Sequence, residues 1–267
     1  RKQHGHSCPG RVLGRDPPMS IELKEIHKAF GSNKVLRGFS LDVKDGETLA
    51  VVGQSGSGKS VALKHVVGLL RPDDGQVWVD DQRLGELSQE ELYEVRRRVG
   101  YVFQFAALFD SLSVGENVGL GLQRIEGMTD RAISERVREC LALVDLEGYE
   151  DRYPAQLSGG QRKRAGLARA IATNPKYLLY DEPTTGLDPV TTTVIDRLII
   201  RTREELGVTS VVITHDMGSA YRIADRIGML YEGVIRFMGT PEEVQACPDP
   251  VVRGFIDGKP ELLEGAG

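Results

Sequence analysis

The residues with the clearest chemical purpose form a glycine-rich run between an apolar segment at 48–52 and a segment with helical character. The run fits the pattern GxxxxGK[ST], and its members are Gly53, Gln54, Ser55, Gly56, Ser57, Gly58, Lys59 and Ser60. Glycines let a loop turn backbone N–H groups toward phosphate oxygens, and a helix N-terminus adds positive potential. The pattern predicts that Lys59 bridges the β- and γ-phosphates of a nucleotide and that Ser60 ligates Mg²⁺. The alternative is a plain glycine-rich turn, which the flanking strand and helix disfavour.

Two adjacent carboxylates follow a buried apolar run at 177–180. In an open α/β sheet this end of a strand faces the ligand. Asp181 can hold Mg²⁺ through water, and Glu182 can orient or deprotonate a water that attacks the γ-phosphate. The alternative is a solvated acidic pair at a strand end, which is the weaker interpretation beside a phosphate-binding loop.

Three further motifs have polar groups that could reach a phosphate. A serine followed by two glycines predicts a second exposed helix N-terminus, formed by Ser158, Gly159, Gly160 and Gln161. Gln104 ends an apolar run, and His215 follows the apolar strand predicted at 211–214. Taken alone, these motifs are also consistent with a capped helix, a strand-end glutamine and a structural histidine.

The elements that must position these residues alternate in the manner of an α/β protein. Strand-like runs dominate residues 21–79, and Ser88 with Glu91 predicts a capped helix. Ser113 with Glu116 predicts another, and residues 129–144 have helical periodicity. We therefore expect a parallel-sheet core, a β-rich antiparallel N-terminal part, and an all-helical insertion at about residues 90–160.

The second half of the chain returns to helix and strand alternation. Helices are predicted at 158–172 and 190–206, strands at 177–180 and 209–213, and a hairpin turn at 231–234. Thr240 precedes a proline and two glutamates, which is typical of a helix start. These patterns predict one domain over 19–245 and a helical C-terminal extension over 246–267. Residues 1–18 are expected to be a disordered tail or a tag remnant, with Met19 as the natural start.

Composition restricts the function classes. The 267 residues carry a net charge of −5 with acidic and basic residues interspersed, so nucleic acid is not an expected partner. The cysteines, Cys8, Cys140 and Cys247, have no metal-site or disulfide-framework spacing, which favours a reducing cytosolic compartment. No run reaches the about 18 apolar residues of a membrane span, so any membrane role is expected to be peripheral.

The order of these motifs resembles the ATP-binding cassette (ABC) family from about residue 20 to 245. The resemblance implies a P-loop ATPase that uses ATP and Mg²⁺ and works as a homodimer. In that family the residues of the second helix start, Ser158, Gly159, Gly160 and Gln161, complete the partner chain's ATP site.

The same resemblance implies roles for the remaining residues. Gln104 would link Mg²⁺ and the attacking water to the helical lobe, and His215 would bind the γ-phosphate and position Glu182. Asp188 matches a loop that crosses the dimer interface. Phe30 matches an aromatic residue that stacks on adenine, although a lone phenylalanine is more often part of the core.

Within the family, the chain is most similar to the MlaF-like ATPases of Mla/Mce phospholipid transport. The similarity lies in residues 103–114, 162–164, 179–189 and 249–258. Gln161 departs from it, because the subfamily often has methionine there. The resemblance implies a separate MlaE-like permease, an Mce-domain lipid-binding protein, and a position on the cytoplasmic face of the bacterial inner membrane.

The apolar side chains at 105–112 could contact a helix of that permease. Packing inside the helical lobe is the alternative. Two other functions remain open, namely an ABC importer for a different solute such as an amino acid, and a non-transport ABC ATPase. The second function is disfavoured because this sequence has neither the basic face nor the long heptad run that non-transport ABC ATPases generally have.

Overall fold

The computed structural model describes residues 19–259 and 261–264, so the tail predicted at 1–18 lies outside the described part. The described strands form two sheets. The antiparallel sheet has the order β2-β1-β4-β5, and the larger sheet has the order β10-β9-β3-β8-β7-β6. The strand bounds are β1 Met19–Phe30, β2 Asn33–Lys44, β3 Thr48–Val52, β4 Asp74–Val79, β5 Gln82–Arg83, β6 Val99–Val102, β7 Tyr177–Asp181, β8 Thr209–Thr214, β9 Arg226–Tyr231 and β10 Val234–Gly239.

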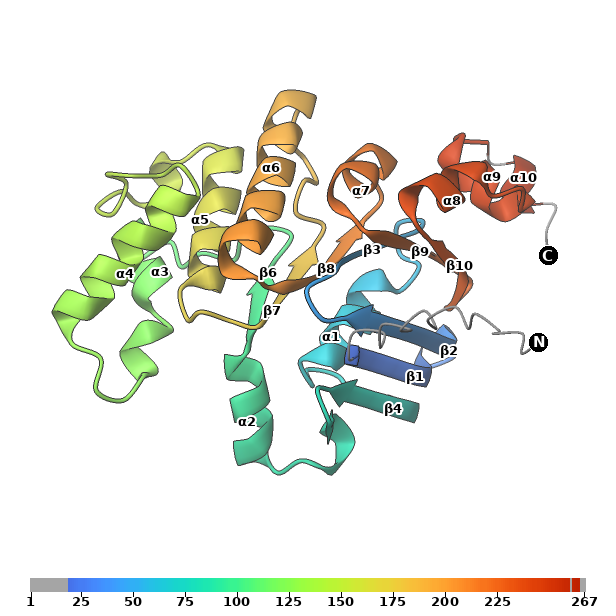
Figure 1. Cartoon of the computed structure of the whole chain (residues 1–267), viewed down its shortest axis with the longest axis horizontal. Coiled ribbons are helices and arrows are strands. Elements are labelled where there is room, and N and C mark those ends of the chain that lie inside the picture. Colours follow the sequence, from blue (N-terminus) through green and yellow to red (C-terminus); the bar gives the residue numbers. More distant parts are fainter. Residues whose placement is uncertain (1–18, 260, 265–267) are drawn as a thin grey trace, which may run out of the picture.

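Helices cover both faces of the larger sheet (Figure 1). The helix bounds are α1 Lys59–Val66, α2 Gln89–Arg97, α3 Val114–Gly119, α4 Asp130–Leu143, α5 Gly159–Ile171, α6 Pro189–Leu206, α7 Met217–Ile223, α8 Pro241–Ala246, α9 Pro250–Ile256 and α10 Glu261–Glu264. Short 3-10 turns lie at η1 Leu84–Glu86, η2 Leu122–Arg124 and η3 Pro154–Gln156. Helix α1 lies between the two sheets, whereas α6 and α7 lie on the opposite face of the larger sheet.

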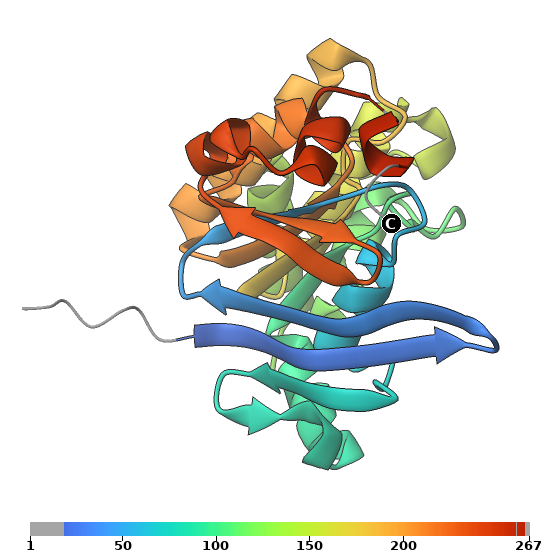
Figure 2. The same ribbon diagram turned by 90° about the vertical axis from the view of Figure 1, so that its right-hand side faces the viewer.

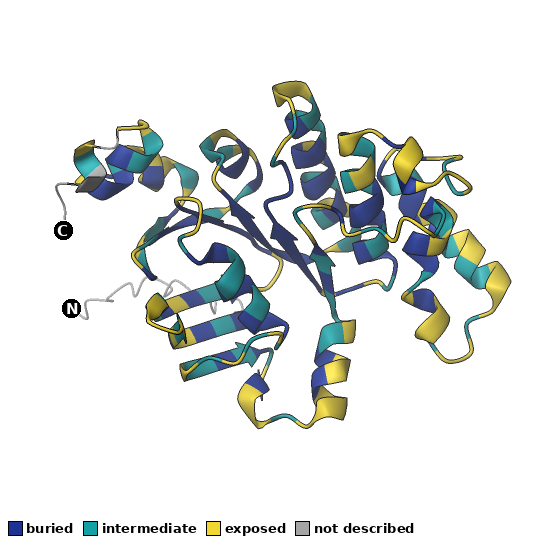
Figure 3. Ribbon diagram, turned by 180° about the vertical axis from the view of Figure 1, so that it is seen from behind, coloured by how far each residue is buried: buried dark blue, intermediate teal, exposed yellow. Residues whose placement is uncertain are grey.

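The larger sheet is parallel except at the β9–β10 hairpin. Strands β3, β7 and β8 are buried along their whole length, as Figure 3 shows. Burial on both faces explains why each of these strands contains several successive apolar residues instead of an alternating pattern. Figure 2 shows the long β1–β2 pair crossing below the β9–β10 hairpin, and Arg37 N–H donates to the Gly233 carbonyl oxygen at 3.0 Å between them.

Local sequence signals place most helix starts correctly. Capping boxes with reciprocal hydrogen bonds begin the helices after Ser88, Ser113, Ser158 and Thr240. The hairpin expected at 231–234 connects β9 and β10. Such agreement arises because a cap or a tight turn depends on only three or four neighbouring residues.

The expectation of an all-helical insertion at about 90–160 is wrong in one respect. Residues Val99–Val102 form strand β6, which pairs in parallel with β7 at the edge of the larger sheet. A β-carbon at Gly100 would lie 2.5 Å from the Ala170 carbonyl oxygen, so the glycine allows α5 to approach this strand. The purely helical lobe therefore begins after β6, with α3 and α4 packing against α5.

Three apolar clusters stabilise the molecule. One joins α3, α4, α5 and α6 to the adjoining face of the larger sheet, and a second joins α1 to both sheets. The third joins α7, α8 and α9 to β3 and β9. Cys140 and Cys247 are buried free thiols, and Cys8 lies outside the described residues. Among the described residues, none of the helices has both the length and the apolar character that a membrane span needs.

Candidate functional site

The glycine-rich loop connects β3 to α1, as predicted. Gly58 has φ +102° and a β-carbon there would lie 2.6 Å from Val35 Cγ1, while one at Gly53 would lie 2.5 Å from the Leu230 carbonyl oxygen. Only glycine fits both positions without displacement of the neighbouring chain. Ser57 Oγ is buried and has no hydrogen-bond partner within the described chain. A buried hydroxyl without a partner and a tightly turned backbone fit a loop that binds phosphate oxygens.

Lys59 lies at the start of α1 with only 5% of its surface exposed. Its Nζ donates to the carbonyl oxygens of Gly53 and Gln54, both at 2.9 Å, and lies 3.5 Å from Glu182 Oε1. Burial lowers the pKa of Lys59, and the carboxylate of Glu182 opposes that effect. The loop therefore holds a buried cation next to a carboxylate from β7.

Oxygen atoms converge between α1 and the end of β7. Ser60 Oγ donates to Asp181 Oδ1 at 2.7 Å, and Tyr101 Oη donates to Asp181 Oδ2 at 3.1 Å. Burial, together with the charge of Asp181, raises the pKa of Tyr101, so its hydroxyl stays protonated and can donate. Hydroxyl and carboxylate oxygens are the ligands that Mg²⁺ prefers, so Ser60 and Asp181 fit a magnesium site.

Glu182 is held from several sides in an uncommon backbone conformation with φ +50°. His215 Nδ1 lies 2.7 Å from Glu182 Oε2, and Thr185 Oγ1 donates to the same oxygen at 3.0 Å. Lys163 Nζ donates to the Glu182 carbonyl oxygen at 3.3 Å. The structure thus brings together Lys59, Glu182 and His215, three of the residues that the sequence analysis proposed for phosphate binding and catalysis.

Gln104 and Phe30 lie at the borders of this cluster. Gln104 follows β6, and within the described chain no hydrogen bond joins it to Asp181 or Glu182. Phe30 ends β1 with 49% of its surface exposed, so it does not belong to the core. It pairs with Asn33, which lines a cleft of about 310 Å³ beside residues 54–57 of the loop.

The helix start at Ser158, which begins α5, is separate from the cluster around the glycine-rich loop. Ser158 Oγ accepts from Gln161 N–H at 3.2 Å, and Gln161 Oε1 accepts from Ser158 N–H at 2.8 Å. Ser158 and Gly159 are exposed, and Gln161 Nε2 donates to Tyr149 Oη at 3.1 Å. Within the described residues, these side chains make no hydrogen bond to the loop cluster.

Asp188 is exposed at the start of α6, where its carboxylate accepts from Val190 and Thr191 N–H, both at 3.0 Å. Hydrogen bonds from the Thr191 side chain and backbone lower the pKa of Asp188. It therefore caps α6 and is also available to a partner surface.

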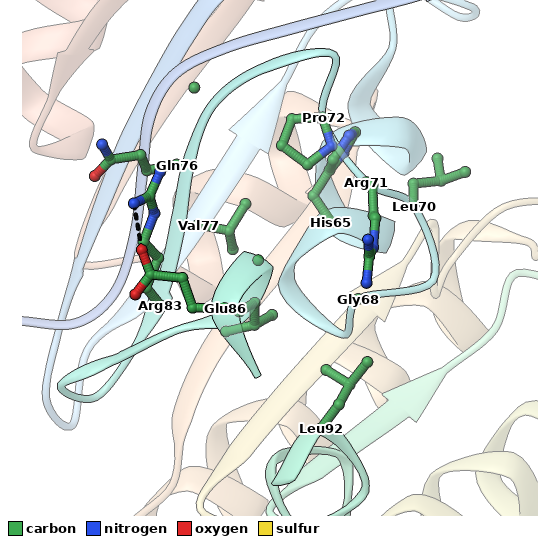
Figure 4. Close-up of a pocket in the computed structure, with 13 residues that line it drawn as sticks. His65, Gly68, Leu70, Arg71, Pro72, Gln76, Val77, Arg83, Glu86 and Leu92 are labelled. Atoms are coloured by element: carbon green, nitrogen blue, oxygen red, sulfur yellow. Dashed lines mark hydrogen bonds and ion pairs between the residues drawn. The ribbon is translucent and has the colours of Figure 1, made fainter. Parts of the chain in front are cut away.

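A separate pocket of about 160 Å³ lies between the end of α1, strand β4, the η1 turn and α2 (Figure 4). His65, Leu92 and the Arg83–Glu86 ion pair are among the residues around it. None of the predicted site residues lines this pocket, so it is distinct from the phosphate-binding loop.

Sequence reasoning missed three contacts of the site. Tyr101, Lys163 and Thr185 each donate a hydrogen bond to Asp181 or Glu182. Thr185 lies three residues beyond Glu182, so its position was a usable signal. Tyr101 and Lys163 come from other elements, and nothing in their local sequence indicates a carboxylate or carbonyl partner.

Comparison with known proteins identifies the family of this chain. A family model described as ABC transporter matches residues 36–185, more than half of the chain. The chain belongs to the ABC transporter family. It is the ATP-binding and ATP-hydrolysing subunit of such a transporter, which confirms the predicted family and enzyme class.

Two curated relatives cover nearly all of this ABC ATPase. Protein TRIGALACTOSYLDIACYLGLYCEROL 3, chloroplastic, of Arabidopsis thaliana is 41% identical over 96% of this chain and 79% of the relative. The probable ribonucleotide transport ATP-binding protein mkl of Mycobacterium leprae is 39% identical over 92% of this chain and 71% of the relative. Both support the predicted MlaF-like resemblance.

Solved structures confirm the predicted fold class. The ATP-binding cassette MJ0796, solved as a dimer in a post-hydrolysis state bound to ADP and Pi, is 36% identical with a TM-score of 0.76. That match covers 83% of this chain and 98% of the other. The cbiO1 protein of Clostridium perfringens, part of the transporter complex cbiONQ, is 28% identical with a TM-score of 0.80 over 92% of this chain and 98% of the other.

Proposed function

We propose that this ABC ATPase energises phospholipid transport of the Mla/Mce type, as a homodimer bound to a separate membrane permease. The homodimer is supported by the division of the proposed site residues into two separate groups. The loop and carboxylates form one cluster, whereas the capped helix start at Ser158 is exposed and makes no hydrogen bond to it within the described residues. A second copy would bring one group to the other, and the similar cassette MJ0796 has been solved as a dimer.

In each copy, the loop residues 53–60 bind the phosphates of ATP, and Phe30 stacks on the adenine. The exposed N–H groups of α5 and the side chain of Ser158 bind the partner copy's γ-phosphate. Asp188 contacts the partner at the dimer interface. ATP thus closes the dimer because it touches both copies, and its hydrolysis reopens the dimer.

Ser60, Asp181 and Gln104 hold Mg²⁺ in this proposal. When bound, Mg²⁺ would neutralise negative charge on the phosphates during phosphoryl transfer. Tyr101 keeps one oxygen of Asp181 occupied at 3.1 Å, which leaves Oδ1 directed toward Ser60. The chain therefore fixes the carboxylate from two sides.

Glu182 acts as the general base for the attacking water. His215 and Thr185 both bind Glu182 Oε2, which restricts the rotation of the carboxylate and leaves Oε1 on the side of Lys59. His215 is about half exposed, so it can also reach the γ-phosphate. This arrangement orients the base before the water arrives, and such orientation lowers the barrier to hydrolysis.

The segment that we assign to permease docking is rigid although it lies outside any helix or strand. The Asn117 amide donates to the carbonyl oxygens of Phe109, Leu112 and Ser113 and accepts from Phe109 N–H at 2.8 Å. Arg169 donates to the carbonyl oxygens at 106 and 107, at 2.8 and 2.6 Å. These clamps fix the backbone from two helices.

The clamped backbone presents its aromatic side chains to solvent. Phe105 is 84% exposed and Phe109 is 53% exposed, whereas Leu108 packs against the helical-lobe core. Exposing two large apolar side chains costs free energy of solvation unless a partner covers them. We assign this patch to a cytoplasmic coupling helix of an MlaE-like permease.

The lipid cargo rests on the MlaF-like similarity and on the Arabidopsis relative, whose name is that of a galactolipid. A sulfate/thiosulfate import protein of Caulobacter vibrioides is also 41% identical over 92% of this chain and 72% of that protein. The cargo is therefore decided by the partners. We propose an Mce-domain protein among them, with this subunit peripheral on the cytoplasmic face of a bacterial inner membrane.

Purification from gently solubilised native membranes, through a C-terminal tag, tests the partners. We expect an MlaE-like permease, an Mce-domain protein and bound phospholipid by mass spectrometry. A permease with a solute-binding protein and no lipid would overturn the cargo while leaving the ATPase assignment. Recovery with ribosomes or nucleic acid at physiological salt would overturn the transport role.

Substitution within the patch tests the docking surface. Phe109→Asp should abolish recovery of the permease and leave a folded chain, because an aspartate cannot be buried against an apolar helix without a partner. Phe109→Leu is the matched control and should retain the permease. Equal recovery with both variants would exclude the patch.

A further inference from the structure

The peptide groups on both sides of Glu182 are fixed by different elements. Its N–H donates to the Ile213 carbonyl oxygen of β8 at 3.0 Å, and its carbonyl oxygen accepts from Lys163 Nζ of α5 at 3.3 Å. Its φ of +50° is a conformation that residues other than glycine rarely adopt. Such a conformation persists where neighbouring groups hold it, and Lys163 is one of those groups.

Placing the ammonium group of Lys163 at this contact costs free energy of desolvation. Burial lowers the pKa of Lys163 to about 8, and the charge of Glu182 opposes that effect. The ammonium is half-buried, and the Glu182 carbonyl oxygen is its hydrogen-bond acceptor within the described residues. By contrast, Arg164 on the same helix donates to Val144 and Asp145, away from the site.

We infer that Lys163 is a positioning residue, which holds the backbone of Glu182 so that its carboxylate points at the attacking water. This inference rests on the proposed role of Glu182 as the base. Lys163 lies about one turn beyond the exposed helix start at Ser158, which binds the partner copy's ATP in that proposal. A single helix therefore connects the partner's nucleotide to this chain's own base.

Through this helix, nucleotide bound to the partner copy would affect the catalytic base of this copy. Movement of α5 on binding the partner's γ-phosphate changes the Lys163–Glu182 contact, and so changes the orientation of the base in this copy. The contact acts on the chemical step and not on nucleotide affinity, because within the described residues Lys163 hydrogen-bonds the Glu182 backbone and makes no hydrogen bond to residues 53–60.

Steady-state ATPase assays of the full chain test the inference. Lys163→Met keeps the length of the side chain without its hydrogen bond, and should lower kcat about tenfold with KM for ATP within about twofold. Lys163→Arg restores a donor and should recover most of kcat. Arg164→Met is the control for loss of a cation from α5 and should keep the wild-type kcat.

A double variant tests whether Lys163 acts through Glu182. In a Glu182→Gln background, Lys163→Met should lower the residual single-turnover rate less than about twofold, because two residues that act as one unit are not additive. Thermal unfolding checks the fold of each variant, and Lys163→Gln replaces Lys163→Met if that variant does not fold.

The outcomes separate the two proposals. Rapid turnover by Glu182→Gln would overturn the role of Glu182 as base. A slow Glu182→Gln with wild-type kcat in Lys163→Met would overturn only the role of Lys163. A rise in KM without a fall in kcat, or a Lys163→Arg variant as slow as Lys163→Met, would also exclude backbone positioning by this cation.

Discussion

The two regions of this chain that we propose bind phosphate are built in opposite ways. Around the glycine-rich loop, charged and polar groups are buried and contact one another, as in the Lys59–Glu182 and Ser60–Asp181 pairs. At the start of α5, Ser158 and Gly159 are exposed, and within the described residues the reciprocal hydrogen bonds there are those of the cap between Ser158 and Gln161. The charged groups of the first region meet within one chain, whereas in the proposed dimer the second region acts on the partner's nucleotide.

Electrostatics explains the difference. A buried charge is stable only when it is paired, so the loop cluster has to satisfy its own groups on folding. A helix N-terminus at the surface can leave its N–H groups to water until a phosphate replaces that water. Substitutions in the first region should therefore affect chemistry and nucleotide affinity, and substitutions in the second should affect dimer closure.

The largest effect is expected from Glu182→Gln. Glutamine keeps the shape of the side chain but cannot accept a proton, so kcat should fall about a thousandfold while ATP binding is retained. Rapid-quench measurement of phosphate release, with filter binding of ATP as the control, checks both halves of this prediction. Near-normal turnover would mean that another group takes the proton.

Lys59→Ala should reduce ATP affinity about a hundredfold. The substitution removes the buried ammonium and leaves Glu182 Oε1 without the cation that lies 3.5 Å away. Fluorescent-nucleotide titration measures the affinity. Wild-type binding by the folded variant would show that backbone N–H groups alone hold the phosphates.

Gly159→Asp should sharpen the contrast between the two regions, with about a thirtyfold loss of turnover. A β-carbon at Gly159 has room, since Leu187 Cδ2 is 3.9 Å away, and an aspartate in the first turn favours the helix. The carboxylate would nevertheless repel the partner's γ-phosphate. Sedimentation with ATP should show a monomer that still binds nucleotide, whereas an ATP-dependent dimer would contradict the separation of the two regions.

Tyr101→Phe should have the smallest effect. Loss of the 3.1 Å hydrogen bond frees one oxygen of Asp181 without creating a large cavity. The Mg²⁺ concentration for half-maximal nucleotide binding should rise about fivefold, with little change in binding without Mg²⁺. Titration with Mn²⁺ followed by its paramagnetic signal provides a readout that is independent of hydrolysis.

The sequence by itself determined the local parts of this protein. Helix caps such as Ser88 and Ser158, the β9–β10 turn and the glycine-rich loop depend on short runs of residues, because their hydrogen bonds join groups three or four positions apart. The apolar runs of β3, β7 and β8 likewise predicted strands of a parallel-sheet core.

Only the tertiary structure decided the rest. Strand β6 lies within the stretch that was predicted to be an all-helical insertion, and its place at the sheet edge depends on the close approach of α5 to Gly100. The contacts of Tyr101 with Asp181 and of Lys163 with Glu182 join residues that are 80 and 19 positions apart. Packing brings those groups together, and a local pattern carries no information about a partner that arrives from another element.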